Sequence, residues 1–241
     1  SLSGGCCFKK LKQRKVTFME ENRVQYYNMI QEGNLDEAQK IKNSLIPDRL
    51  YKYFSFGNES CTDSSVSQCC KSYSLNNSKI ETLENNKTWL ASFDNLNDPF
   101  ERRSLVPNYN WLEDSGYPTK VIKEMISAFY NSVIITSLTP IFNSMPMWAH
   151  YSNNHNGFCV EYRIVKPDKV YPVFYEPQRV PATSIVANYI DLAIKTGKKG
   201  IDPFTDKNFV RYFLCMFNNI NMKHEYWTYE QEFRLVYMAF N

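Results

Sequence analysis

The segment YEQEFRLVYMAF, residues 229–240, predicts a long β-strand near the C-terminal end of this 241-residue sequence. Alternation with a period of two places Tyr229, Gln231, Phe233, Leu235 and Tyr237 on one face, and Glu230, Glu232, Arg234 and Val236 on the other. We expect the first set to pack in the core. Glu230 and Glu232 then point into one space, where repulsion raises one pKa unless a cation such as Arg234 intervenes. The alternative is a solvated face whose ion pair contributes at most about 1 kcal/mol.

A second segment, NSMPMWAHYSNNHNGFCVEY from Asn143 to Tyr162, predicts a short helix that runs into a strand. If MWAHY is helical, Trp148 and Tyr151 share one side at a spacing of three residues, and His150 lies beside them. Such a surface suits proton transfer and stacking on a planar ring. For His150 alone, a structural role is the alternative. His155 lies within NNHNG and is expected in a turn.

A third feature is the polar turn NLNDPFE, residues 95–101, which follows a predicted strand. Asn97 and Asp98 precede a proline, so a turn or cap that bonds its own backbone is the default interpretation. Strand ends also present polar groups to ligands, which makes Asn97, Asp98 and Glu101 candidate binding residues. A metal site is a further alternative, because Asp98 and Glu101 could share one cation with the carboxylates Glu230 and Glu232.

The composition indicates a folded protein with an aromatic core. Apolar residues make up 43% and charged residues 22%, with 17 Tyr and 16 Phe. A net charge of +3 and a pI of 8.3 are too mild for a dedicated nucleic-acid-binding protein. Since no apolar run approaches about 18 residues, the sequence predicts no transmembrane helix.

The seven cysteines are odd in number and show no repeated spacing, which favours a reducing compartment and a cytoplasmic location. Cys61, Cys69 and Cys70 belong to a Ser-rich segment that we interpret as a loop rather than a zinc site. Cys159 is expected to be an ordinary strand thiol. The sequence predicts no bound metal and no disulfide scaffold.

The N-terminal region, residues 1–46, is expected to combine a basic, solvated terminus with a helical hairpin. Apolar positions recur at helical spacing across residues 18–45, and Gly33 and Asn34 form the corner. The remainder, residues 47–241, is predicted to be one α+β domain with a curved, largely antiparallel sheet and helices inserted between strand pairs.

The predicted elements of that domain follow from periodicity and turn residues. We expect strands at residues 49–56, 88–93, 132–138, 157–164, 169–175 and 229–240, and helices at 79–86, 120–130, 182–196 and 205–222. Residues 57–77 are predicted to be a polar loop and the stretch before Pro118 to be irregular. Strand 169–175 is expected to pair with strand 157–164.

The order of LYKYFSF, WLASFDNLNDPFE, IITSLTP, MPMWAHYSNNHNGFCVEY and WTYEQEFRLVY resembles a widespread bacterial family of unknown function, found partly among phage-defence genes. The signatures of that family are K-Y, N-D-P-F, M-W-x-H-Y and E-x-E-x-R. The resemblance extends from about Leu50 to Tyr237. It implies family membership without an established reaction.

The chain also resembles, more distantly, the ADP-ribosyltransferases. Lys52 and Tyr53, then Tyr151 or Ser137, then Glu230 and Glu232 occur in the order of that family's NAD-holding, nicotinamide-facing and catalytic residues. The resemblance implies a similar fold and NAD or another nucleotide as ligand.

The site that this resemblance implies has distinct roles for its residues. Glu232 is the catalytic carboxylate, Glu230 orients the acceptor, Lys52 and Tyr53 hold phosphate and ribose, and Trp148, His150 and Tyr151 form the nicotinamide wall. The alternative is a non-catalytic sensor or antitoxin-like module whose N-terminal hairpin docks on a protein partner.

Overall fold

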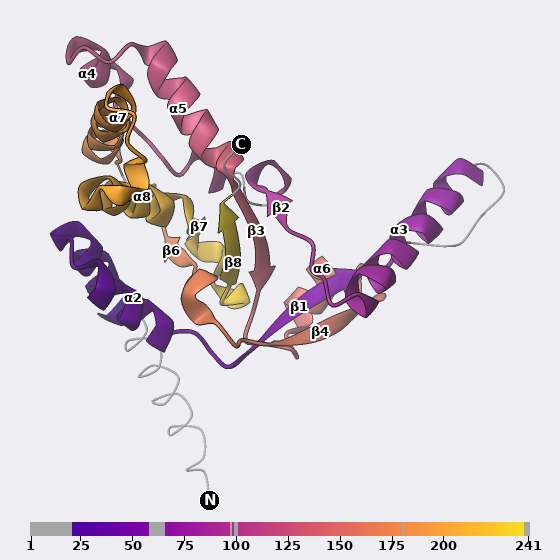
Figure 1. Cartoon of the computed structure of the whole chain (residues 1–241). Coiled ribbons are helices and arrows are strands. Elements are labelled where there is room, and N and C mark those ends of the chain that lie inside the picture. The colour runs from indigo at the N-terminus through magenta and orange to yellow at the C-terminus, as the bar shows by residue number, and fades with distance from the viewer. Residues whose placement is uncertain (1–20, 58–65, 97, 99–100, 180, 239–241) are drawn as a thin grey trace, which may run out of the picture.

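The computed structural model describes residues 21–57, 66–96, 98, 101–179 and 181–238. It shows a mixed arrangement of helices and strands, with most helices gathered on one side of a central sheet and a two-stranded ribbon extending from the other side (Figure 1). The basic N-terminal run, Asn97, Pro99 and Cys61 lie outside the described residues.

The N-terminal helical hairpin is confirmed. Residues 21–32 are helical, α2 spans Leu35–Ser44, and Gly33 forms the corner with a φ of 83° that suits glycine. The apolar side of the hairpin packs on the rest of the chain through a cluster of buried residues that consists of Tyr26, Ile30, Ala38, Ile41 and Cys215.

Lys42 fastens α2 to the body of the protein. Its ammonium group donates hydrogen bonds to the backbone carbonyls of Pro167, Asp168 and Val170 at 2.7, 2.9 and 2.8 Å. These three bonds use all the donors of the lysine, whose side chain is fully buried. Burial lowers the pKa of Lys42 to about 8.

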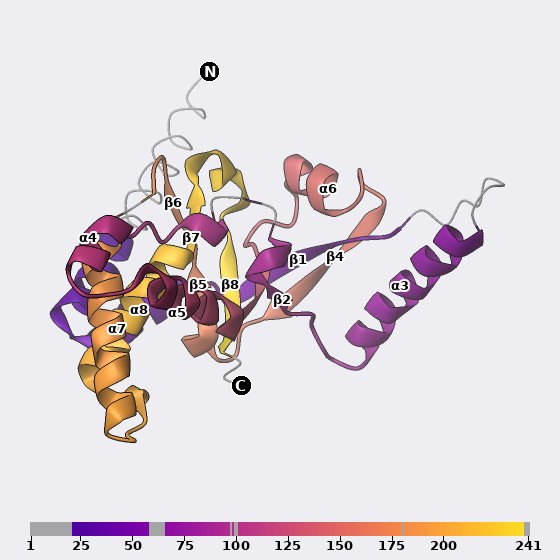
Figure 2. The same cartoon turned by 90° about the horizontal axis from the view of Figure 1, so that it is seen from above.

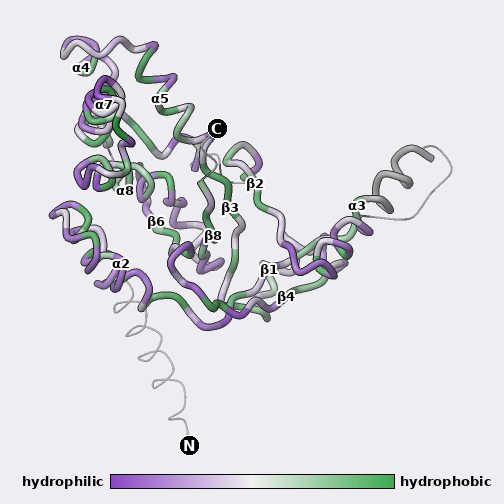
Figure 3. Tube along the Cα trace, viewed as in Figure 1, coloured by the Kyte–Doolittle hydropathy of each residue, from purple (hydrophilic) through white to green (hydrophobic). Residues whose placement is uncertain are grey.

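The central sheet has the strand order β2-β3-β8-β5, and all of its neighbours are antiparallel. Its strands are β2 (Ala91–Ser92), β3 (Val133–Leu138), β5 (Val170–Pro172) and β8 (Phe233–Met238). The β-branched residues of β3 favour an extended backbone, and this strand is mostly buried. Figure 3 shows the hydrophobic character of β3 within the fold.

Helices cover one face of this sheet. They are α4 (Tyr109–Asp114), α5 (Thr119–Ser132), α7 (Thr183–Lys198) and α8 (Lys207–Ile220). Ile135 and Val236 face them across the largest apolar cluster, which includes Ile122 and Phe129 of α5 and Phe213 of α8. The view from above shows α5, α7 and α8 gathered on the same side (Figure 2). This core fixes the position of β8.

The second structural unit is a two-stranded antiparallel ribbon of β1 (Arg49–Ser55) and β4 (Gly157–Arg163). Helix α6 (Met145–Tyr151) packs against β1, and α3 (Val66–Glu84) lies near the far end of the ribbon in both views (Figures 1 and 2). Reciprocal backbone hydrogen bonds between Tyr51 and Thr139 join the ribbon to the end of β3. The ribbon therefore continues from the central sheet.

A short parallel pair, β6 (Phe174–Glu176) and β7 (Met222–His224), completes the described strands. A 3-10 helix, η5 (Glu225–Glu230), leads from β7 to β8. Four further 3-10 turns are described, namely η1 (Phe93–Asn95), η2 (Glu101–Arg103), η3 (Pro167–Lys169) and η4 (Pro203–Thr205).

Several predictions about the elements are wrong. In the described residues the strands form three sheets rather than one, and β5 pairs with β8 instead of β4. The predicted loop of residues 57–77 contains the first half of α3, and the stretch before Pro118 contains α4. The composition of α3 explains the error, because its many Ser and Asn residues favour turns over helices.

The long strand predicted for residues 229–240 is also wrong in part. Glu230 ends η5, and the strand begins only at Phe233. Both faces of β8 are covered. Phe233 packs with Leu50 and Leu138, whereas Arg234 shares the helix-covered face with Val236 and is fully buried. The charged face is therefore more buried than predicted, and Tyr237 of the other face is exposed.

Candidate functional site

Glu230 and Glu232 come together because the chain turns between them. Gln231 has the left-handed backbone conformation, with φ 46° and ψ 48°. Both carboxylates accept hydrogen bonds from the ammonium group of Lys223 on β7, at 2.6 Å for Glu230 and 3.0 Å for Glu232. The predicted convergence is therefore present, but a local turn produces it instead of strand alternation.

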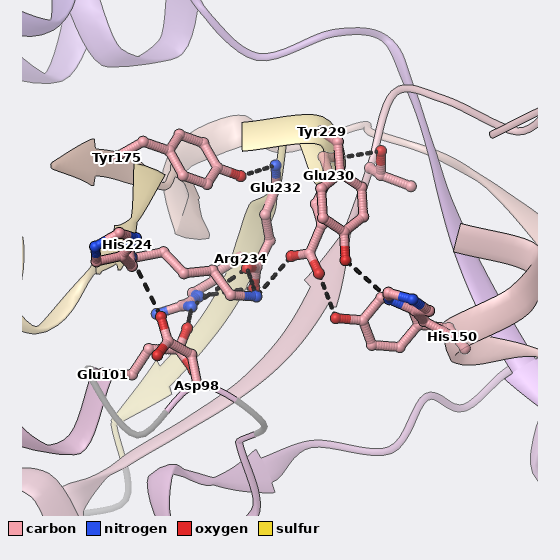
Figure 4. A network of polar contacts seen from close by, with 12 residues as sticks. Asp98, Glu101, His150, Tyr175, His224, Tyr229, Glu230, Glu232 and Arg234 are labelled. Atoms are coloured by element: carbon pink, nitrogen blue, oxygen red, sulfur yellow. Dashed lines mark hydrogen bonds and ion pairs between the residues drawn. The ribbon is translucent and has the colours of Figure 1, made fainter. Parts of the chain in front are cut away.

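Arg234 is the second cation of the site, as the sequence predicts. Its Nε donates to Glu232 at 2.9 Å, and one of its terminal nitrogens donates to Glu101 of η2. Asp98 lies close to the same guanidinium and accepts a hydrogen bond from the backbone N–H of His224 at 3.2 Å. Figure 4 shows Asp98 and Glu101 on one side of Arg234 and Glu232 on the other.

Tyr151 connects helix α6 to this network. Its hydroxyl donates a short hydrogen bond to Glu230, so that one carboxylate is held by a tyrosine on one oxygen and by Lys223 on the other. Ser144 caps the start of α6, because its side chain accepts a hydrogen bond from the backbone of Met147. The cap and the first turn set the direction in which Tyr151 points.

A cavity of about 110 Å³ lies beside these groups, and we call it the Glu230 cavity. The acidic and basic residues of its wall are three glutamates and two lysines, namely Glu101, Glu230, Glu232, Lys52 and Lys223. Further lining residues are Tyr51, Tyr53, Leu96, Ser137, Leu138, Thr139, Met147 and Tyr151. The ribbon, α6, β3, β7 and η5 thus all contribute to one concave space.

Lys52 enters the cavity from β1. Its ammonium group donates a short hydrogen bond to the hydroxyl of Thr136 on β3. Burial lowers the pKa of Lys52 to about 8, and the charge of Glu232 opposes that shift. Lys52 is therefore a cation whose desolvation is only partly compensated.

The buried charges on the wall of the cavity affect one another. Glu230, Glu232 and Lys223 are 3, 4 and 5% exposed. Burial raises the pKa of Glu230, although Lys223 opposes the shift. Burial lowers the pKa of Lys223, but the negative charges of Glu232 and Glu230 outweigh burial and raise it. Lys223 is thus the charged partner that keeps the two carboxylates together.

Other predicted site residues lie outside the wall of the cavity. His150 is exposed and bonds the hydroxyl of Tyr229 at 3.0 Å, and Trp148 packs edge-on against Tyr53 with ring centroids 5.1 Å apart. Of the three residues predicted to form the nicotinamide wall, Tyr151 lines the cavity, whereas Trp148 and His150 are not among its lining residues. Asn97 lies outside the described residues.

His155 and Cys159 have the positions that the sequence predicts. His155 has a φ of 69° in the turn before β4, where Asn153 and Asn154 are also left-handed. Cys159 is a free thiol on β4, and burial raises its pKa to about 11, which disfavours the reactive thiolate.

Sequence reasoning missed Lys223 and Tyr175. Lys223 follows directly on the last predicted helix and lies in a three-residue strand without periodicity. Tyr175 accepts a hydrogen bond on its hydroxyl from the backbone N–H of Glu232 at 2.7 Å. Lys223 is a single lysine before HEYW, residues 224–227, and no motif or periodic pattern marks it in the sequence.

The metal alternative requires carboxylates that converge on one cation. Glu101 and Glu232 do converge, but the guanidinium of Arg234 lies between them. Within the described ranges, no group of three or more His, Cys, Asp or Glu side chains is arranged to hold a metal ion. In this arrangement Arg234 and Lys223 are the cations that bond the carboxylates.

The fold and the site define a mixed α+β protein with a buried charge network on the wall of a small cavity. Residues 147–235 match the sequence model of the family described as "Protein of unknown function (DUF2971)". The match begins at Met147 in α6 and ends at Leu235 in β8, so it includes Tyr151, Lys223 and both glutamates. No curated protein and no solved structure matches the chain. Among the described residues, no helix is long and apolar enough to cross a membrane.

Proposed function

We propose that the Glu230 cavity binds the ribose end of a nucleotide, with NAD as the first candidate, and that the protein cleaves or transfers across the bond between the sugar and its base. One observation carries this proposal. A carboxylate, a tyrosine hydroxyl and two ammonium groups share the wall of one partly apolar cavity. Ligand sites typically combine such a concave space with a few polar groups.

The chemistry of the proposed reaction suits the wall. When a base leaves a ribose, positive charge develops at C1 of the sugar, and a fixed carboxylate stabilises that charge. An ADP-ribosyltransferase-like reaction uses a glutamate in this way. The same wall offers Tyr151 as a hydroxyl that can shift a proton to or from Glu230.

The hydrogen bonds favour Glu230 over Glu232 as the reacting carboxylate. Both oxygens of Glu232 accept from cations, since Arg234 and Lys223 hold them at 2.9 and 3.0 Å. One oxygen of Glu230 is held by Lys223 and the other by the neutral hydroxyl of Tyr151. We therefore exchange the roles expected from the ADP-ribosyltransferase resemblance, with Glu230 acting on the sugar and Glu232 positioning Lys223.

The volume of the cavity limits how much of a ligand it can enclose. A volume of about 110 Å³ is less than the roughly 300–1,000 Å³ of a pocket that encloses a whole drug-sized ligand. One ring of the nucleotide fits inside, and the remainder lies over the surface. Tyr51 and Phe142, whose ring centroids are 5.5 Å apart, offer aromatic faces beside the cavity for that remainder.

Calorimetry and an activity assay test the proposal. Nicotinamide riboside and NAD are expected to bind, and Glu230→Gln is expected to abolish NAD consumption while the protein stays folded. Glu225→Gln is the matched control, because Glu225 is exposed on the same 3-10 helix. Unchanged NAD consumption in Glu230→Gln, or equal losses in both variants, contradicts the proposal.

A partner-binding module based on the N-terminal hairpin has less support. Most of the apolar residues of the hairpin already pack against Cys215 and its neighbours, and Val24 is the large apolar side chain of the described hairpin that stays exposed for a partner. A role in phage defence rests on the family resemblance alone. If calorimetry detects no binding of any nucleotide, that result would favour the partner-binding module.

A further inference from the structure

We infer that Lys52 is an imine-forming residue, whose amine condenses with the aldehyde of a small sugar that enters the Glu230 cavity. The identity of the sugar rests on the proposed function, whereas the reactivity of Lys52 is independent of it. The class of ligand is an aldose phosphate or the open-chain form of a released ribose.

The position of Lys52 carries the inference. Among the lysines of the described chain, Lys52 and Lys223 line the cavity. Lys223 is held by two carboxylates in the network and stays protonated. Lys52 makes one hydrogen bond, to the neutral hydroxyl of Thr136, and an uncharged partner leaves the nitrogen able to lose its proton.

The surroundings of Lys52 lower the cost of the neutral amine. Burial lowers its pKa to about 8, so an appreciable fraction is deprotonated near neutral pH. A desolvated lysine in an apolar pocket is a recognised route to an amine nucleophile. Tyr53 and Leu138 supply apolar surface in the same wall.

The proposed step is balanced. The nitrogen lone pair of Lys52 forms a bond to the aldehyde carbon, and the proton that the nitrogen then loses ends on the carbonyl oxygen to give a carbinolamine. The hydroxyl takes up a second proton, the carbon–oxygen bond breaks and water leaves, which gives a protonated imine that forms the neutral imine when it returns this proton. The hydroxyl of Tyr151 lies in the same wall and can donate the proton that water loss requires, and Glu230, which accepts the hydrogen bond of this hydroxyl, can return a proton to it.

Reductive trapping tests the inference on the wild-type chain. The protein is incubated with ribose 5-phosphate and cyanoborohydride, which converts the imine to a stable secondary amine, and the modified lysines are located by peptide mass spectrometry. We expect Lys52 to be modified about tenfold faster than exposed lysines such as Lys169.

Two other lysines serve as internal controls. Lys42 also has a pKa of about 8, but its nitrogen is caged by three carbonyls and lies away from the cavity. Burial lowers the pKa of Lys79 as well, and this residue bonds Ser55 instead of facing the cavity. If a lowered pKa alone governed the reaction, Lys42 or Lys79 would be modified as fast as Lys52.

Lys52→Arg provides the confirming variant, since it keeps the charge and removes the amine. Loss of the fast adduct, with slow labelling elsewhere unchanged, supports the inference. Modification spread evenly over the lysines, or faster at Lys79, overturns it even if Lys52→Arg does not fold. Trapping at Lys52 without any NAD cleavage refutes the proposed function alone, and NAD cleavage without trapping refutes the imine alone.

Discussion

Replacing Lys223 by methionine is the sharpest test of the network. The substitution keeps the length of the side chain but removes the ammonium group that bonds Glu230 at 2.6 Å and Glu232 at 3.0 Å. Removing one partner of a buried ion pair costs about 3–5 kcal/mol, because the other charge stays buried. The free energy of unfolding of a native protein is only about 5–15 kcal/mol. Lys223→Met should therefore remove a large share of the stability of this protein near neutral pH.

The loss should depend on pH with a defined sign. The folded protein holds a proton on Glu230 more tightly than the unfolded chain does, because burial raises the pKa of this residue. The stability that this proton contributes is fully present below the pKa of the unfolded chain. It is lost as the pH rises through the folded pKa. Lys223→Met raises that folded pKa further, so the variant should be closer to wild type in acid than at neutral pH.

Urea unfolding at about pH 7.5 and at about pH 5 measures both effects. The double variant Lys223→Met/Glu230→Gln should recover part of the loss, since it leaves Glu232 with Arg234 and removes the unpaired charge. Lys120→Met, which breaks an exposed pair with Glu124, should change stability by about 0.5 kcal/mol or less. A cost below about 1 kcal/mol for Lys223→Met, or no recovery in the double variant, would refute the reasoning.

Three further substitutions address other contacts. Tyr151→Phe should lower the free energy of unfolding by about 1.5–3 kcal/mol, because it removes a hydrogen bond to a charged carboxylate. Since that hydrogen bond favours the charged form of Glu230, its loss should also raise the pKa of Glu230, which carboxyl NMR titration would detect. Lys42→Met should lower the free energy of unfolding by about 2–4 kcal/mol and speed amide hydrogen exchange in residues 21–45. Exchange rates in these residues equal to those of the wild type would refute the role of Lys42 as an anchor. Gly157→Ala should lower the melting temperature, because a Cβ would overlap the carbonyl oxygen of Phe54. The control Gly197→Ala has free space and should stabilise α7 by about 0.5 kcal/mol.

The local elements with strong periodicity were predictable from the sequence. The hairpin, α5 and β3 follow from apolar spacing, and the corner at Gly33 follows from its backbone preference. The pairing of β1 with β4 was not predictable, because it joins Arg49 to Arg163 across a long stretch of chain. Periodicity says which face of a strand is apolar, and it carries no information on which strand lies beside it.

The sequence predicted most of the residues of the candidate site but not their arrangement. Glu230, Glu232, Tyr151 and Lys52 were named from the sequence, and all four line the cavity. Their arrangement depends on Gln231 in the left-handed conformation, which glutamine rarely adopts and no sequence rule suggests. Lys223, which holds the two carboxylates together, lies in an aperiodic segment and escaped detection.

The energetics of this network argue for a role beyond holding the fold. Apolar residues of similar volume often replace buried ion pairs at no cost in stability, so a network that only supported the core would have little advantage over packing. A purely structural network would also be closed on all sides. Here Glu230, Lys52 and Tyr151 face a cavity instead of packed side chains, and the pKa of Lys52 is lowered on that same wall. Perturbed titratable groups around a cavity are typical of sites that bind or transform a ligand, and the Glu230 cavity is therefore where activity should be sought first.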